Sequence, residues 1–220
     1  MVANLAGGRL DPDRAVAAVA NMLLGGVFTS RLNQNLRERN GYSYGAASRL
    51  VRLSGAGLFS AGAAVRTDVT GESVKEILSE LTRLRGEAVS AADLIKGKKS
   101  LQQRLVSQCE RPEGLAQVFA DLARSGLPLD ELSRLLTAAQ ASTSASLQQV
   151  VGPLLDPQRL TVVVVGDLKK VEAAVRKQLG AVWRQLMGSH YPAMSMIFVS
   201  DLLDHPGKIE LEATAAVPAA

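Results

Sequence analysis

The sequence predicts an α+β domain, a two-layer sandwich in which helices cover a mostly antiparallel sheet. Amphipathic helical patterns occupy most of the chain, two extended segments between residues 42 and 65 flank a short turn, and one β-branched run lies near residue 160. Because strands and helices do not alternate regularly, a doubly wound parallel sheet is disfavoured. With 220 residues the chain can bury a sizeable core.

Two helices are predicted in the first 40 residues. The first begins at Asp11-Pro12-Asp13, which offers a cap, proline at the first helical position and acid in the first turn. We expect Gly25-Gly26 to end it and a second, shorter helix to end at Asn40-Gly41. The expected buried face of the first consists of Val16, Val19, Ala20 and Leu23. That of the second consists of Phe28, Leu32 and Leu36.

An antiparallel hairpin is predicted from residues 42–53 and 57–65, joined by a turn at Ser54-Gly55. Glycine and alanine are frequent in both strands, so little side chain stands between the sheet and whatever packs on it. Either a helix or a peptide could approach closely, and close packing of a helix is the simpler interpretation.

The middle of the chain predicts a series of helices. A stripe in the first consists of Val74, Ile77, Leu78, Leu81 and Leu84. Ser90 and Asp93 approximate a capping box for the next. Pro112 opens a helix that Gly126 stops. Its expected apolar face consists of Leu115, Val118, Phe119 and Leu122. Leucines from 129 to 136 mark another helix, and residues 142–146 cap a last short one.

The run from Arg159 to Val165 predicts a strand that shares a sheet with the hairpin, since each needs a partner. A turn at Gly166-Asp167 and a helix carrying Val171, Val175, Leu179 and Val182 follow. We expect residues 1–187 to form one domain, and 188–220 to be an appendage with one short strand, 194–199, and a disordered end. The few residues before Asp11 leave room only for a truncated first strand, which suggests a fragment of a longer chain.

Composition argues against several classes of function. The 25 basic residues are interleaved with 21 acidic ones, so the net charge of +4 does not predict nucleic-acid binding. No apolar run approaches the roughly 18 to 20 residues of a membrane span, and the first ten residues do not resemble a secretory signal. A single cysteine, Cys109, allows no internal disulfide or thiolate cluster and is compatible with either a reducing or an oxidising compartment.

Motifs for a resident cofactor are also lacking. His190 and His205 are too far apart in sequence to form a short-range pair of zinc ligands, so we expect no metal site and no cofactor in this chain. Gly25-Gly26 lacks the pattern of a phosphate-binding loop. Cys109 has no recognisable triad, and the lysines at 96, 98 and 99 are expected on a solvated helix face.

The most informative stretch is Gly-Gly-Val-Phe-Thr-Ser-Arg-Leu from residue 25, followed by Leu-Arg-Glu from 36 and Gly-Tyr-Ser-Tyr from 41. It resembles the domain that follows the zinc-binding domain in the pitrilysin and mitochondrial processing peptidase family of zinc metallopeptidases. The Val162 to Asp167 run is similar to the closing strand of that domain, so the resemblance covers about residues 3 to 180. The inverted zinc motif of the family, His-x-x-Glu-His, has no match here.

The resemblance implies that this chain is the non-zinc half of a peptidase, inactive alone, with zinc held by a partner domain or subunit. The Arg and Tyr that face the zinc in relatives correspond to Arg37 and Tyr44, seven residues apart. Zinc-assisted peptide hydrolysis places negative charge on the scissile carbonyl oxygen, which positioned donors can stabilise. The implied partners are a peptide substrate and the zinc-bearing half.

Alternatives remain for these residues and for the chain. In a purely structural role, Arg37 would cover the carbonyls at a helix end and Tyr44 would fill a half-buried strand position. Tyr42 is a second candidate for the tyrosine role, five residues after Arg37 rather than seven. Two other functions are a scaffold domain, as in relatives that are core subunits of respiratory complexes, and a module that binds peptides along the hairpin edge.

Overall fold

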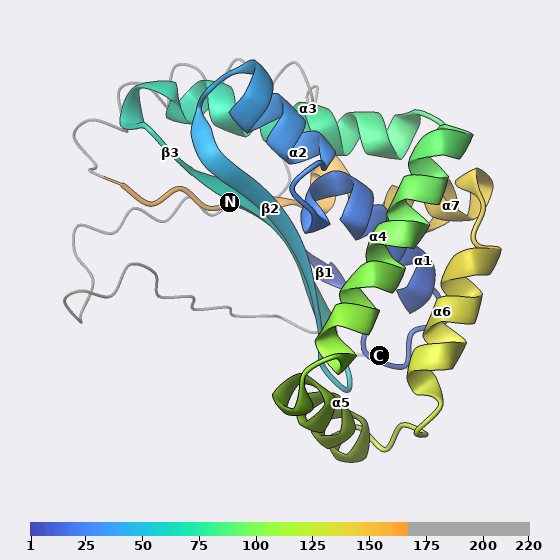
Figure 1. Cartoon of the computed structure of the whole chain (residues 1–220). Helices are drawn as coiled ribbons and strands as arrows, with labels where there is room; N and C mark the ends of the chain where they lie inside the picture. The colour runs from blue at the N-terminus through green and yellow to red at the C-terminus, as the bar shows by residue number, and fades with distance from the viewer. Residues whose placement is uncertain (167–220) are drawn as a thin grey trace, which may run out of the picture.

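The computed structural model describes residues 1–166 and contains a four-stranded sheet in the order β2-β3-β1-β4. The strands are β1 (Val2–Ala6), β2 (Ser43–Arg52), β3 (Gly57–Val65) and β4 (Thr161–Val162), and every neighbouring pair is antiparallel. The main helices gather on one side of the curved β2–β3 ribbon (Figure 1). The predicted α+β two-layer class is therefore confirmed.

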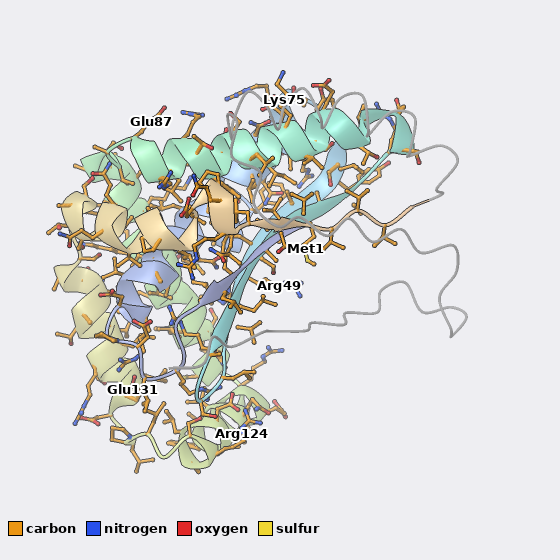
Figure 2. The ribbon with its side chains drawn as sticks, turned by 180° about the vertical axis from the view of Figure 1, so that it is seen from behind. Met1, Arg49, Lys75, Glu87, Arg124 and Glu131 are labelled. Atoms are coloured by element: carbon orange, nitrogen blue, oxygen red, sulfur yellow. The ribbon has the colours of Figure 1, made fainter. Side chains whose placement is uncertain are left out.

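The hairpin matches its predicted bounds to within one residue, with β2 and β3 paired from Ser43↔Val65 to Arg52↔Gly57. From Ala46 onward, the residues of β2 alternate between more buried and more exposed. Ala46 and Ser48 are buried, whereas Arg49 lies exposed on the opposite face of the sheet (Figure 2). This period of two is that of a sheet with one covered face. The register is irregular only between Ser43 and Ala46, a point that matters for the site.

The predicted strand at 159–165 joins the same sheet but is shorter. Residues Pro157–Arg159 form a 3₁₀ turn. The strand β4 is limited to Thr161 and Val162, which pair with Ala3 and Val2 of β1, and Val163 extends the pairing by exchanging two backbone hydrogen bonds with Met1. Strand β1 therefore lies between the hairpin and β4 and connects them. The prediction that hairpin and late strand share one sheet is confirmed, and the few residues before Asp11 do supply a strand.

The N-terminal helix begins later than predicted. Helix α1 spans Arg14–Asn21, because Asp11 accepts the Asp13 N–H at 2.8 Å through Oδ1 and the Arg14 N–H at 3.1 Å through its carbonyl, which holds these residues in a turn. The helix continues as a π-helical segment, η1 (Met22–Gly26), and ends at the predicted Gly25-Gly26. The core behind the sheet includes Val19, Leu23 and Leu24.

In the described part of the chain, five α-helices follow the hairpin: α3 (Thr70–Gly86), α4 (Ala91–Cys109), α5 (Pro112–Arg124), α6 (Glu131–Ala141) and α7 (Ser144–Leu154). A 3₁₀ turn, η3 (Thr67–Val69), precedes α3. The whole predicted stripe of α3 is buried, and the Ser90 side chain caps α4 by accepting the Asp93 N–H. In α5 only Val118 and Leu122 are buried, whereas Leu115 and Phe119 are exposed. Where α6 begins, Glu131 accepts from Arg14 of α1 (Figure 2).

The N-terminal helices also correct one expectation. By length and composition alone the helical stretch Arg14–Arg39 is apolar enough to cross a membrane, with 61% of its window buried. In the fold it is interrupted by the segment 27–30 and supplies core residues, and a buried core helix meets the same two criteria. The predicted helix at 171–182, the strand at 194–199 and the appendage 188–220 lie outside the described residues.

Candidate functional site

The motif residues meet where the second helical stretch turns into β2. That stretch consists of α2 (Arg31–Asn33) and a π-helical segment, η2 (Gln34–Arg39). The Gly41 N–H donates to the Arg37 carbonyl at 3.1 Å and the Tyr42 N–H to the Leu36 carbonyl at 2.8 Å. Gly41 has φ of 62°, the left-handed conformation that glycine adopts at no steric cost. The end of the helix and the start of the strand are thus joined directly.

Arg37 lies near the end of η2 with its side chain 37% exposed. Its guanidinium carbon lies over the ring of Phe28, 4.2 Å from the centroid, and its Nε lies 3.5 Å from Glu38 Oε1. Within residues 1–166 the Arg37 side chain donates to no helix-end carbonyl. The alternative that Arg37 covers the end of its helix is therefore not supported.

Phe28 is itself placed differently from the prediction. It precedes α2 in the segment 27–30 and its side chain is 58% exposed, whereas Leu32 and Leu36 are fully buried as predicted. The segment leaves η1 in an extended conformation at Val27, which turns the next side chain away from the core.

Among the described residues, Tyr44 is the most exposed of the large hydrophobic residues, at 99%. It lies within the irregularity of β2, where the Ser43 hydroxyl donates to the Gly45 carbonyl at 2.6 Å and accepts the Gly45 N–H at 3.1 Å. Tyr42, the competing tyrosine, is half-buried and packs against the core. A half-buried structural position therefore describes Tyr42 and not Tyr44.

Arg37 and Tyr44 share this corner of the molecule without being bonded to each other. No hydrogen bond links their side chains in the part of the chain that the structure describes. Arg37 is partly accessible to solvent and carries a forked cation, and Tyr44 is fully accessible and carries a phenol. The arrangement can supply two hydrogen-bond donors to a ligand that approaches this corner.

Three asparagines that sequence reasoning did not single out hold the corner together. The Asn33 amide donates to the Ala46 carbonyl at 2.7 Å, and its Oδ1 accepts the Ala46 N–H at 2.9 Å. Asn35 donates to Glu76 and Glu80 of α3, and Asn40 donates back to Asn35. Asparagine is a poor helix former, so its repetition in this helical stretch was the available signal.

Glu80 belongs to the same network and is almost fully buried. Its Oε1 accepts from Asn35 at 2.9 Å and from Arg83 at 3.1 Å. Hydrogen bonding to Glu87, together with the charges of Glu80 and Glu87, raises the pKa of the Arg83 guanidinium. The carboxylate that anchors the helix of Arg37 is therefore paired with a permanent cation.

The described residues do not fit a zinc site. Among residues 1–166 no group of three or more His, Cys, Asp or Glu side chains is placed to hold a metal ion, and both histidines lie outside this range. Cys109 is a half-buried free thiol at the end of α4. Lys96 and Lys98 of α4 donate to the carbonyls of Thr29 and Gln140, so they connect this helix to its neighbours.

Comparison with known proteins gives consistent results. Residues 1–101 match the family model described as the peptidase M16 inactive domain. An uncharacterised zinc protease of Rickettsia felis is 25% identical over 146 residues, which cover 60% of this chain and 35% of that protein. The chain thus spans about a third of the length of this relative.

Solved structures share the fold. The peptidase M16 inactive domain from Pseudomonas fluorescens superimposes with a TM-score of 0.65 at 22% identity, over 72% of this chain and 38% of that one. A protease from Helicobacter pylori gives 0.63 at 21% identity, over 72% and 38%. Together with the motif from residue 25 and the match over residues 1–101, these results confirm the family resemblance. Over residues 1–101 the chain is therefore similar to the inactive domain of the peptidase M16 family.

Proposed function

We propose that this chain is the zinc-free half of a zinc peptidase, in which Arg37 and Tyr44 bind the scissile carbonyl of a peptide held against the corner between η2 and β2. The observation that carries the proposal is the state of these two side chains. Tyr44 is fully exposed and Arg37 partly exposed, and within residues 1–166 Arg37 contacts only Phe28 and, through Nε, Glu38, while the Tyr44 hydroxyl and the Arg37 Nη groups make no hydrogen bond.

The chemistry requires donors aimed at a developing negative charge. When a peptide carbonyl is attacked, its oxygen gains charge, and a donor already in place stabilises the transition state more than the substrate. Arg37 contributes a permanent cation with forked N–H groups, and Tyr44 a neutral hydroxyl. The metal that hydrolysis requires in this family belongs to the partner half, because the described residues do not fit it.

A different use of the domain, peptide binding by strand addition along the outer edge of β2, has less support. Ala46 is opposite Ala63 in the register, yet its N–H and carbonyl both bond the Asn33 carboxamide on the other side. The edge is thus already occupied at the point nearest Tyr44. An incoming strand would have to displace Asn33 before it could pair there.

The test is reconstitution with a partner that contains His-x-x-Glu-His, sought upstream in the same gene or in a neighbouring gene. Arg37→Lys keeps the charge but loses the fork, and Tyr44→Phe keeps the ring but loses the hydroxyl. We expect each to lower peptide cleavage by on the order of a hundredfold, equivalent to about 3 kcal/mol of barrier, without weakening assembly.

Matched controls lie two residues away in each case. Arg39→Lys changes an exposed arginine of the same helical segment, and Tyr42→Phe removes a hydroxyl from a tyrosine packed on the core. Both controls should cleave at the parental rate. If Arg37→Lys and Tyr44→Phe also stay within about twofold of the parent, the catalytic role is wrong and the domain acts as a scaffold.

A further inference from the structure

Phe28 is an exposed aromatic side chain that the proposed catalytic chemistry does not itself use. It follows Gly25-Gly26 and Val27 and leads into Ser30, a buried residue. Phe28 as a residue is 58% exposed, so it forgoes much of the stabilisation that burial of a large apolar side chain gives. A fold that maximised stability would turn this ring inward, as it does with Phe59 of β3.

The segment around Phe28 is nevertheless held firmly. The Ser30 N–H donates to the Val27 carbonyl at 3.1 Å, and the Asn33 amide donates to the same carbonyl at 3.3 Å. At the residue that follows Phe28, the Lys96 ammonium donates to the Thr29 carbonyl at 2.7 Å. Hydrogen bonds to the residues before and after Phe28 therefore hold the backbone of the segment in place, while the Phe28 side chain stays largely exposed.

The guanidinium of Arg37 lies over the face of the Phe28 ring. Its carbon lies 4.2 Å from the ring centroid, well within the range of a cation–π contact. Stacking engages the flat face of the guanidinium and leaves the N–H groups at its edge available. The one carboxylate beside Arg37 in the described residues, that of Glu38, lies 3.5 Å from Nε, so it does not occupy the Nη groups that a substrate carbonyl needs.

We infer that Phe28 is a positioning residue for Arg37: the ring holds the guanidinium in one place and orientation while leaving both Nη groups free for the substrate. This inference rests on the proposed function of Arg37. Phe28 acts through the arginine and touches no reacting atom. The role needs an aromatic ring at residue 28 rather than apolar volume alone.

The experiment compares Phe28→Leu, which removes the ring and keeps apolar volume, with Phe28→Trp, which keeps an aromatic face. Phe119→Leu is the matched control, because Phe119 is a similarly exposed phenylalanine on the distant helix α5. In the reconstituted complex, Phe28→Leu should lower kcat about two- to fivefold with little change in KM, and Phe28→Trp should restore it. Phe119→Leu should cleave like the parent.

A spectroscopic signature tests the contact without any activity. In the chain alone, the Arg37 Nε–H resonance, assigned by its loss in Arg37→Lys, should show a ring-current shift that disappears in Phe28→Leu and persists in Phe119→Leu. If the resonance is unaffected by Phe28→Leu, the inference is wrong. It is also wrong if Arg37→Lys impairs cleavage while Phe28→Leu does not, although the function of Arg37 then stands. If neither variant impairs cleavage, the proposed function fails, and the positioning role with it.

Discussion

Asn33 shows how a single side chain can complete a sheet. Its carboxamide meets the N–H and carbonyl of Ala46 as a neighbouring strand would, and within residues 1–166 no strand pairs with β2 on that side. The same amide donates to Val27 and Ser30, so one residue joins the segment of Phe28 to the strand of Tyr44. The site geometry therefore depends on a residue that takes no part in the chemistry.

Replacing Asn33 should cost more stability than its size suggests. Asn33→Ala leaves the Ala46 N–H and carbonyl buried without partners, and we expect a loss of about 1–3 kcal/mol in the free energy of unfolding. Urea unfolding at unchanged m-value measures it. Gln34→Ala, on an exposed neighbour, is the control and should change stability by less than about 0.5 kcal/mol. Equal midpoints for the two variants would mean that the Asn33 clamp contributes nothing.

At the scale of the elements, η1 and β2 approach each other closely because Gly25 has no side chain. A Cβ built on Gly25 would overlap the Ser48 backbone nitrogen and lie 2.8 Å from the Ala47 carbonyl carbon. The neighbouring Asn21 accepts the Ser48 hydroxyl at 2.7 Å, which fixes the same contact. Gly25 therefore serves the close packing of η1 on the sheet, and at Ala47 and Ser48 a helical segment is what approaches the small residues of the hairpin.

Alanine substitutions at two helical glycines should therefore have opposite effects. Gly25→Ala forces η1 away from β2 and should destabilise the domain by about 1–3 kcal/mol. Gly86→Ala at the end of α3 meets nothing within 4 Å and should stabilise the domain by about 0.4–1 kcal/mol, because it reduces the conformational freedom of the unfolded chain. Thermal unfolding of both variants gives the signs, and a stable Gly25→Ala protein would refute the close approach.

Most elements could be predicted because local patterns fix them. The α3 stripe, the Ser90 cap and the hairpin follow from periodicity and turn chemistry, which act over a few residues. The late start of α1 and the shortening of β4 depend on competing turns at Asp11 and Pro157. The π-helical segments and the exposure of Phe28 depend on packing between distant elements, which no local pattern records.

The site could be predicted only in part, and only through the family motif. Nothing in the spacing of Arg37 and Tyr44 reveals that one stacks on Phe28 while the other points into solvent from an irregular strand. The asparagine clamp joins residues 13 apart in sequence, and the Asn35 bond to Glu80 joins residues 45 apart. Such contacts exist only once the tertiary fold has formed.

Over the whole molecule, the core lies between the sheet and the helices, and the candidate site lies outside it. Helix α1 packs in the middle, against α4, α6 and α7 (Figure 1). Arg37 of η2 and Tyr44 of β2 are accessible at the surface. A surface site of two donors can bind and polarise a carbonyl, but it offers no nucleophile. Under the proposed function, the domain would complete an active site whose zinc and nucleophile belong to a second domain or subunit.

The whole chain should accordingly be free of zinc and inactive when purified alone. A catalytic zinc site needs three protein ligands placed together, and residues 1–166 contain no such group. We expect elemental analysis after dialysis against a chelator to give well below one zinc per chain, and added zinc to produce no peptide cleavage. His190→Ala with His205→Ala is a suitable control, since both histidines lie beyond residue 166 and the double variant should give the same result. One tightly retained zinc per chain, lost in the double variant, would show that the chain builds its own metal site and that the division between two halves is wrong.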